Sequence, residues 1–151
     1  LDMNLPSKFG MTYIGPDGNE HVPIMLHRTI FGAMERFCAV LIEHYEGVFP
    51  TWLSPVQAVV LPISEKQKDY ADKIYSEIKE SGIRVEIDSS NESLGKRIRN
   101  AKQQKTPYLV VIGDKEMEAG KITVESRDGE SKQKTSDEFI RDISEEIKER
   151  K

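Results

Sequence analysis

His27, Gly32 and Arg36 have the residue types and the spacing that a nucleotide site requires. They belong to the run His27–Phe37, which we expect to begin an apolar helix. Gly32 has no side chain, so a flat base could lie directly against the backbone there. Arg36 follows four residues later, about one helical turn away, and its permanent positive charge can bind a phosphate or stack on a base. The run therefore predicts part of a nucleotide pocket.

Structural roles stay open for the same side chains. A lone histidine is more often structural than a metal ligand, and no further His or Cys stands at a suitable spacing from His27. An arginine on an otherwise apolar helix needs an anion or an aromatic partner. Arg36 could therefore form an ion pair with a neighbouring element instead of binding a nucleotide.

Asn91 and Glu116 form a second candidate site, because each follows an expected parallel strand. In an open α/β sheet, ligands bind at the carboxyl ends of such strands. Amide and carboxylate groups suit the Watson–Crick edges of unstacked bases, by which RNA sequence is usually read. A basic cluster follows the first loop and could hold a phosphate backbone: Lys96, Arg97, Arg99, Lys102 and Lys105. The alternatives are that Asn91 caps a helix, Glu116 is a solvated turn acid and the cluster is a solvated helix face.

A hairpin and a helix are expected to position the first candidate site. Strands are expected at Met11–Ile14 and His21–Leu26, around the turn residues Gly15–Asn19. Apolar residues at helical spacing predict a helix over Thr29–Tyr45, and further apolar residues indicate burial on several of its sides. We expect Cys38 to be a buried thiol within this helix. The first six residues are expected to have no helix or strand of their own.

Strands and helices alternate after a stiff connector bracketed by Pro50 and Pro55, which we take as the domain boundary. The unbroken apolar run at Tyr108–Ile112 is typical of a central parallel strand. Other strands are expected at residues 57–63, 83–87, 122–125 and 130–134, and helices after residue 64, near 94 and near 137. Two capping boxes are expected, at Ser64 with Gln67 and at Thr135 with Glu138. The order predicts an α/β fold with a mixed five-stranded sheet and helices on both faces.

Composition limits the class of protein. The chain has 151 residues, which suggests one domain or one domain with a piece of another. Its net charge of −4 argues against non-specific nucleic-acid binding but leaves room for a local basic patch. No apolar run approaches the ~20 residues of a membrane span, and no secretory signal is present. A single cysteine fits a reducing compartment, so we expect a cytoplasmic protein without a membrane partner.

The run His27–Phe37 resembles the third sequence motif of class II aminoacyl-tRNA synthetases, and Phe49–Gln57 resembles the threonyl-tRNA synthetases in particular. Shorter matches lie at Gly82–Val85, Pro107–Tyr108 and Gly113–Glu116. The resemblance implies that residues 1–54 are the end of the catalytic domain and residues 55–151 an anticodon-binding domain. It implies a ligase that activates threonine with ATP and Mg²⁺ and transfers it to tRNA(Thr), as a homodimer when full-length.

The resemblance also implies roles for individual residues of the first part. Arg36 would be the catalytic arginine that stacks on the ATP adenine and contacts its phosphates, and Gly32 would let the base approach the backbone. His27 would help to hold a catalytic Zn²⁺ that binds the threonine amine and hydroxyl. The family's other zinc ligands and its first two motifs are missing, so this chain alone should neither bind zinc tightly nor aminoacylate tRNA.

In the second part, Glu116 would accept hydrogen bonds from the guanine at the second position of the threonine anticodon, and Asn91 would contact the uracil at the third. Glu125 stands where many relatives carry an arginine that helps to read the anticodon, and a carboxylate cannot replace it. Arg127 could substitute from the same strand face. Two alternatives stay open, namely a stand-alone RNA-binding accessory protein and a protein-interaction or dimerisation module.

Overall fold

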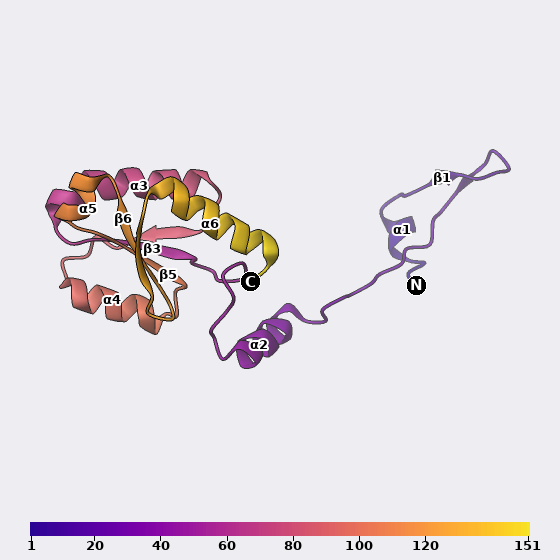
Figure 1. Cartoon of the computed structure of the whole chain (residues 1–151). Helices are drawn as coiled ribbons and strands as arrows, with labels where there is room; N and C mark the ends of the chain where they lie inside the picture. Colours follow the sequence, from indigo (N-terminus) through magenta and orange to yellow (C-terminus); the bar gives the residue numbers. More distant parts are fainter. The chain divides into compact units, whose positions relative to one another are not determined.

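A computed structural model describes all 151 residues, which form two compact units, Leu1–Leu41 and Ile42–Lys151. The units divide within helix α2 (Met34–Tyr45), and the five-stranded sheet lies wholly in the second unit (Figure 1). The functional boundary expected between residues 54 and 55 stays a prediction, since the compact units separate at an earlier position.

The first unit contains the expected hairpin in a shorter form. Strands β1 (Tyr13–Ile14) and β2 (Glu20–His21) pair antiparallel, with Tyr13 opposite His21. Both strands are exposed, and a lone two-stranded hairpin is marginally stable in water, so the pairing does not extend along the expected runs. A four-residue helix, α1 (Leu5–Lys8), was not expected. It begins where the Asp2 carboxylate accepts hydrogen bonds from the backbone of Asn4 and Leu5, both at 2.9 Å.

Helix α2 corrects two expectations. It begins at Met34 and not at Thr29, because Gly32 has a φ of +68°, in the left-handed region that a right-handed helix cannot include. None of its residues is buried, so the prediction of a helix buried on several sides is wrong for this chain. Cys38 is exposed as well, which contradicts the expected buried thiol. The apolar pattern of α2 shows which faces of the helix could pack against another element. It does not show whether such an element is present in this chain.

The second unit confirms the mixed five-stranded sheet. Its strands are β3 (Ala58–Pro62), β4 (Val85–Ile87), β5 (Tyr108–Ile112), β6 (Ile122–Ser126) and β7 (Ser131–Lys134). Their order is β4-β3-β5-β6-β7, with β3 parallel to β4 and β5, and with β6 antiparallel to β5 and β7. The apolar strand β5 is therefore central, as predicted.

Helices cover both faces of this sheet, as expected (Figure 1). They are η1 (Glu65–Gln67), α3 (Lys68–Glu80), α4 (Leu94–Gln103), α5 (Asp114–Ala119) and α6 (Ser136–Glu149). On one face, Ile74 and Ile78 of α3 and Phe139 of α6 pack against Val110. On the other face, Ala101 of α4 packs against Leu109. Both expected capping boxes are present.

The connector before the sheet is fastened to the second unit by side chains. The buried Gln57 donates to Thr51 O at 2.9 Å and accepts from the backbone N–H of Arg84 at 2.9 Å. The guanidinium of Arg84 donates to Ser54 O and Trp52 O, both at 2.8 Å. These bonds hold the main chain of the connector in place directly before β3.

Candidate nucleic-acid interface

The carboxyl ends of the three parallel strands bring Asn91, Ile63 and Glu116 to one rim. Ile63 follows β3, and its N–H donates to Ile112 O, the last carbonyl of β5, at 2.9 Å. The Asp88 N–H, directly after β4, donates to Val60 O at 3.0 Å. The structure thus places Asn91 and Glu116 at the same edge of the sheet, with the 47 % exposed Ile63 following the strand between them.

Asn91 lies in a polar cleft of about 290 Å³ at this rim. The cleft is also lined by Ile63, Ser64, Lys68 and Arg97. The N-cap of α4 is Ser93, so the alternative that Asn91 caps this helix is wrong. The exposed amide of Asn91 offers both a hydrogen-bond donor and an acceptor to a ligand in the cleft.

Glu116 is held in a defined orientation. The expected loop after β5 is helix α5, and Glu116 reaches back to its N-cap Gly113, whose N–H donates to Glu116 Oε2 at 3.0 Å. Its other oxygen accepts from Thr123 Oγ1 at 2.8 Å and from Gln133 Nε2 at 3.4 Å. The alternative of a freely solvated turn acid is therefore wrong.

These hydrogen bonds also set the charge of Glu116. Desolvation acts to raise the pKa of this carboxyl, but the hydrogen bonds from Thr123, the local backbone and Gln133 outweigh it and hold the pKa below its ordinary value. Glu116 is therefore ionised at neutral pH and can only accept hydrogen bonds. Each carboxylate oxygen has more than one acceptor position, so a base donor can still be accommodated.

An open polar part of the sheet adjoins Glu116. Thr123 lies opposite Val111 and Glu125 opposite Leu109, and opposed residues of antiparallel strands point to the same face. Both therefore lie on the α4 face of the sheet. The apolar core under α4 includes residues of β3 and β5 but none of β6 or β7. The part of this face over β6 and β7 is consequently polar and accessible to a ligand.

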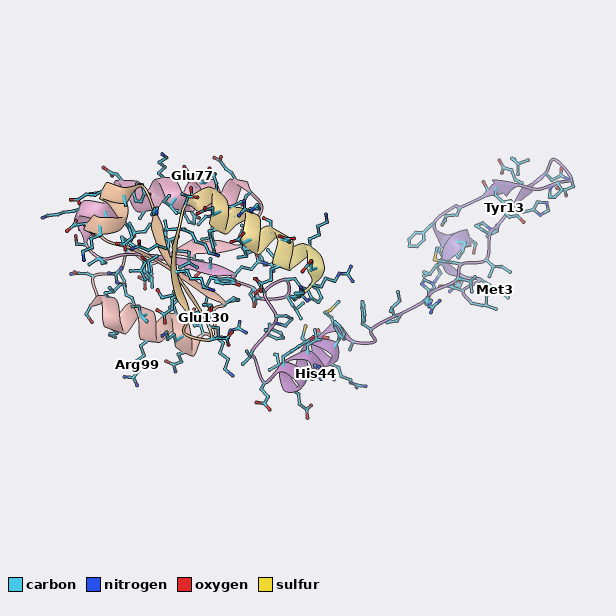
Figure 2. The ribbon with its side chains drawn as sticks, viewed as in Figure 1. Met3, Tyr13, His44, Glu77, Arg99 and Glu130 are labelled. Carbon is cyan, nitrogen blue, oxygen red and sulfur yellow. The ribbon has the colours of Figure 1, made fainter.

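The basic residues on α4 differ in their surroundings: two are paired with carboxylates, one is buried and one is open to solvent. Lys96 pairs with Glu92 at 2.6 Å and Lys102 with Glu125 at 2.5 Å, so neighbouring carboxylates offset two of the charges. Arg97 is only 4 % exposed and donates to backbone carbonyls, which contradicts its expected contact with a phosphate backbone. Figure 2 shows Arg99 extending from α4 away from the sheet, where it is open to solvent.

Arg127 lies away from the rim. Strand β6 ends at Ser126, and the Arg127 N–H donates to Pro107 O at 2.9 Å, beside the first residue of β5. The rim lies at the other end of β5, a strand about 16 Å long. The guanidinium donates to Phe49 O at 3.0 Å and to Lys105 O at 2.8 Å. These contacts correct the expectation that Arg127 substitutes as an anticodon reader, because its donors serve the main chain at the wrong end of the sheet.

The first unit does not bring its predicted site residues His27, Gly32 and Arg36 together into a complete zinc or nucleotide site. His27 Nε2 lies 2.9 Å from Asp2 Oδ2, and no group of three or more His, Cys, Asp or Glu residues surrounds a common point in the chain. The residues present therefore do not fit a zinc site by themselves. Arg36 is exposed, and Gly32 precedes the helix that carries Arg36, so the expected spacing of one helical turn does not hold. Phe31 and Phe37 stack beside them with ring centroids 4.5 Å apart.

None of the helices combines the length and the apolar content that crossing a bilayer requires.

Residues 57–149 match the family model described as an anticodon binding domain. Prolyl-tRNA synthetase from Cryptosporidium parvum, 22 % identical, shares the fold over 99 % of this chain and 32 % of its own, with a TM-score of 0.66. The chain therefore belongs to the anticodon binding domain family.

The chain is also homologous to the threonine–tRNA ligases, which are longer proteins. It is 51 % identical to the enzyme of Caldanaerobacter subterraneus subsp. tengcongensis over 97 % of this chain and 23 % of that protein. It is 47 % identical to the enzyme of Carboxydothermus hydrogenoformans over 100 % of this chain and 24 % of that protein. The RNA binding domain of threonyl-tRNA synthetase from Cryptosporidium parvum Iowa II is 36 % identical, with a TM-score of 0.73 over 95 % of this chain and 37 % of its own. The chain thus spans about a quarter of the length of the curated relatives it matches.

Proposed function

We propose that the second unit reads the anticodon of tRNA(Thr) as part of a threonine–tRNA ligase. The observation that carries this proposal is the rim, where an exposed amide, an exposed apolar side chain and an oriented carboxylate follow three neighbouring strands. Homology to threonine–tRNA ligases supports the choice of tRNA.

Each rim residue has a distinct task in this proposal. Glu116 accepts hydrogen bonds from the N–H groups on the Watson–Crick edge of guanine, because an ionised carboxylate has only acceptors. Asn91 donates to and accepts from the edge of uracil, which presents both kinds of group. Ile63 offers an apolar surface on which an unstacked base can rest. Arg99 supplies a phosphate contact that carries no sequence information.

The first unit is proposed to contribute to a catalytic domain that is completed by residues outside this chain. Arg36 would bind the ATP–Mg²⁺ substrate, Gly32 would lie against its adenine, and His27 would be one ligand of a zinc ion. In the whole enzyme, these residues would serve the joining of threonine to tRNA(Thr), in a cytoplasmic homodimer. The chain by itself is expected to be inactive in aminoacylation.

The test of anticodon reading uses the 151-residue chain and anticodon stem-loops of tRNA(Thr). We expect the natural stem-loop to bind at least about tenfold more tightly than one with its middle anticodon base changed from G to A, a difference of about 1.4 kcal/mol. Equal dissociation constants for the two RNAs would overturn the proposal.

The exposed apolar residues Met34, Val40 and Ile42 of α2 favour a second candidate, a protein-interaction or dimerisation module. Sedimentation equilibrium distinguishes the two functions. A chain that is monomeric at micromolar concentration and discriminates between the stem-loops supports anticodon reading. A stable dimer that binds neither RNA supports the interaction module.

A further inference from the structure

We infer that Arg97 is a positioning residue that holds the Asn91 side of the rim in the conformation that reads a base. The inference rests on the proposed function, because it concerns the same rim. Arg97 would not touch RNA itself. It would act through the main chain of the segments that carry Ile63 and Asn91.

The guanidinium of Arg97 joins the ends of two strands. Nη2 donates to Pro62 O, the last carbonyl of β3, at 2.7 Å, and approaches Ile63 O at 3.4 Å. Nη1 donates to Asp88 O, directly after β4, at 2.8 Å. One side chain of α4 therefore fixes the main chain at both sides of the cleft that contains Asn91.

The constraint continues from Asp88 toward Asn91. The Asp88 carboxylate accepts a hydrogen bond from the N–H of Ser90 at 2.9 Å, which closes a local turn. Ser90 is the residue directly before Asn91. Fixing the carbonyl of Asp88 therefore also fixes the start of the segment from which the Asn91 amide projects.

The burial of Arg97 indicates why an arginine is used here. The side chain is 4 % exposed, its Nε has no hydrogen-bond partner, and its other donors serve carbonyls without a carboxylate among them. Burying a cation is costly unless its donors are satisfied. The planar fork of arginine reaches carbonyls on two strands at once, whereas a lysine ammonium donates from a single atom. The guanidinium of Arg97 thus serves to orient the backbone at the ends of β3 and β4.

Glu116 provides an internal reference, because none of the groups that hydrogen-bond to its carboxylate is bonded to Arg97. Its orientation comes from Gly113, Thr123 and Gln133. Loss of Arg97 should therefore impair recognition of the base that contacts Asn91 and spare recognition of the base that contacts Glu116. A general loss of folding would impair both.

Arg99 provides a matched control variant two residues further along the same helix. It is exposed, whereas Arg97 is buried. Arg99→Gln should weaken binding of all stem-loops by a similar factor and reduce the salt dependence of binding. Arg97→Met should leave the salt dependence unchanged, because its charge contacts no phosphate.

The experiment measures dissociation constants of the 151-residue chain for three stem-loops: the natural one, one with the third anticodon base changed from U to C, and one with the second base changed from G to A. We expect Arg97→Met to lower discrimination at the third base about tenfold and to keep discrimination at the second base. Arg97→Lys, which retains one donor atom, should recover part of the loss. Unchanged discrimination in Arg97→Met, equal loss at both bases, or equal loss in Arg97→Met and Arg97→Lys would overturn the inference.

Amide hydrogen exchange without RNA separates this inference from the proposed function. In Arg97→Met the hydrogen-bonded amides of Asp88 and Ser90 should exchange faster, while those of β5 and β6 keep their protection. If Arg97→Met does not fold, the same comparison is made with Arg97→Lys. Wild-type protein that does not discriminate between the stem-loops refutes the proposed function, whereas unchanged exchange at Asp88 and Ser90 refutes the role of Arg97.

Discussion

The hydroxyl of Thr123 donates a hydrogen bond to Glu116 Oε1 at 2.8 Å, which joins helix α5 to strand β6. Glu116 thereby joins the N-terminus of α5 to the polar face of the sheet. Its carboxylate is oriented before any ligand arrives. An oriented acceptor binds a base more tightly than a mobile one, because less conformational entropy is lost on binding.

Acid should weaken both the second unit and its RNA binding through Glu116. The pKa of Glu116 in the folded chain is below its ordinary value. The stabilisation from its ionised form is therefore complete above that ordinary value and is lost as the pH falls through the lowered folded pKa. Urea unfolding between pH 3 and 7 should show a smaller acid loss in Glu116→Gln than in wild type. Identical pH profiles of the two proteins would contradict this role.

Gln57→Leu should destabilise the second unit by about 2 kcal/mol, because it leaves the buried Thr51 carbonyl and the Arg84 N–H without their partner. The measurement is the free energy of unfolding in urea. Gln133→Leu is the control, since Gln133 is exposed and makes only a 3.4 Å hydrogen bond. Equal losses in the two variants would mean that the side chain of Gln57 does not fasten the connector.

Phe139→Ala should lower the free energy of unfolding by about 3 to 5 kcal/mol, because it opens a cavity between α6 and the sheet. Phe31→Ala should cost less than about 1 kcal/mol, since Phe31 is 56 % exposed. Both variants are compared by urea unfolding monitored by far-UV circular dichroism. A large effect of Phe31→Ala would show that this residue has packing partners in solution.

Removal of metal should leave this chain unchanged. His27 has Asp2 beside it but no set of three ligands, so EDTA should shift neither the unfolding temperature nor the affinity for the stem-loop. Elemental analysis should find much less than one zinc ion per chain. Stoichiometric zinc that His27→Ala removes would show that the chain completes a metal site by itself.

Local patterns predicted most elements of the second unit. The apolar run of β5 indicated a central strand because a strand buried on both faces cannot alternate with polar residues. The capping boxes marked helix starts because they satisfy N–H groups within a few residues. Helix α5 was missed, although Glu116 stands three residues after Gly113 and is followed by good helix formers.

The different roles of Arg97 and Arg99 had a signal in the sequence. Arg97 follows Leu94 by three residues and precedes Ala101 by four, so helical spacing puts it on the apolar face of α4. Charge alone does not separate these five basic residues, whereas their helical spacing does. The sequence carried no signal for the carbonyls that Arg97 contacts, because Pro62 lies at the end of β3, far from α4 in the chain.

The sequence by itself determined most strands and helices of the second unit and their order, since period, capping and turn chemistry act between neighbouring residues. Only the tertiary structure decided which charges are available to a ligand. The guanidinium of Arg97 donates to the carbonyls of Pro62 and Asp88. The guanidinium of Arg127 donates to the carbonyls of Phe49 and Lys105. Such contacts join residues far apart in the chain, and they depend on strand order and helix placement that local patterns do not encode.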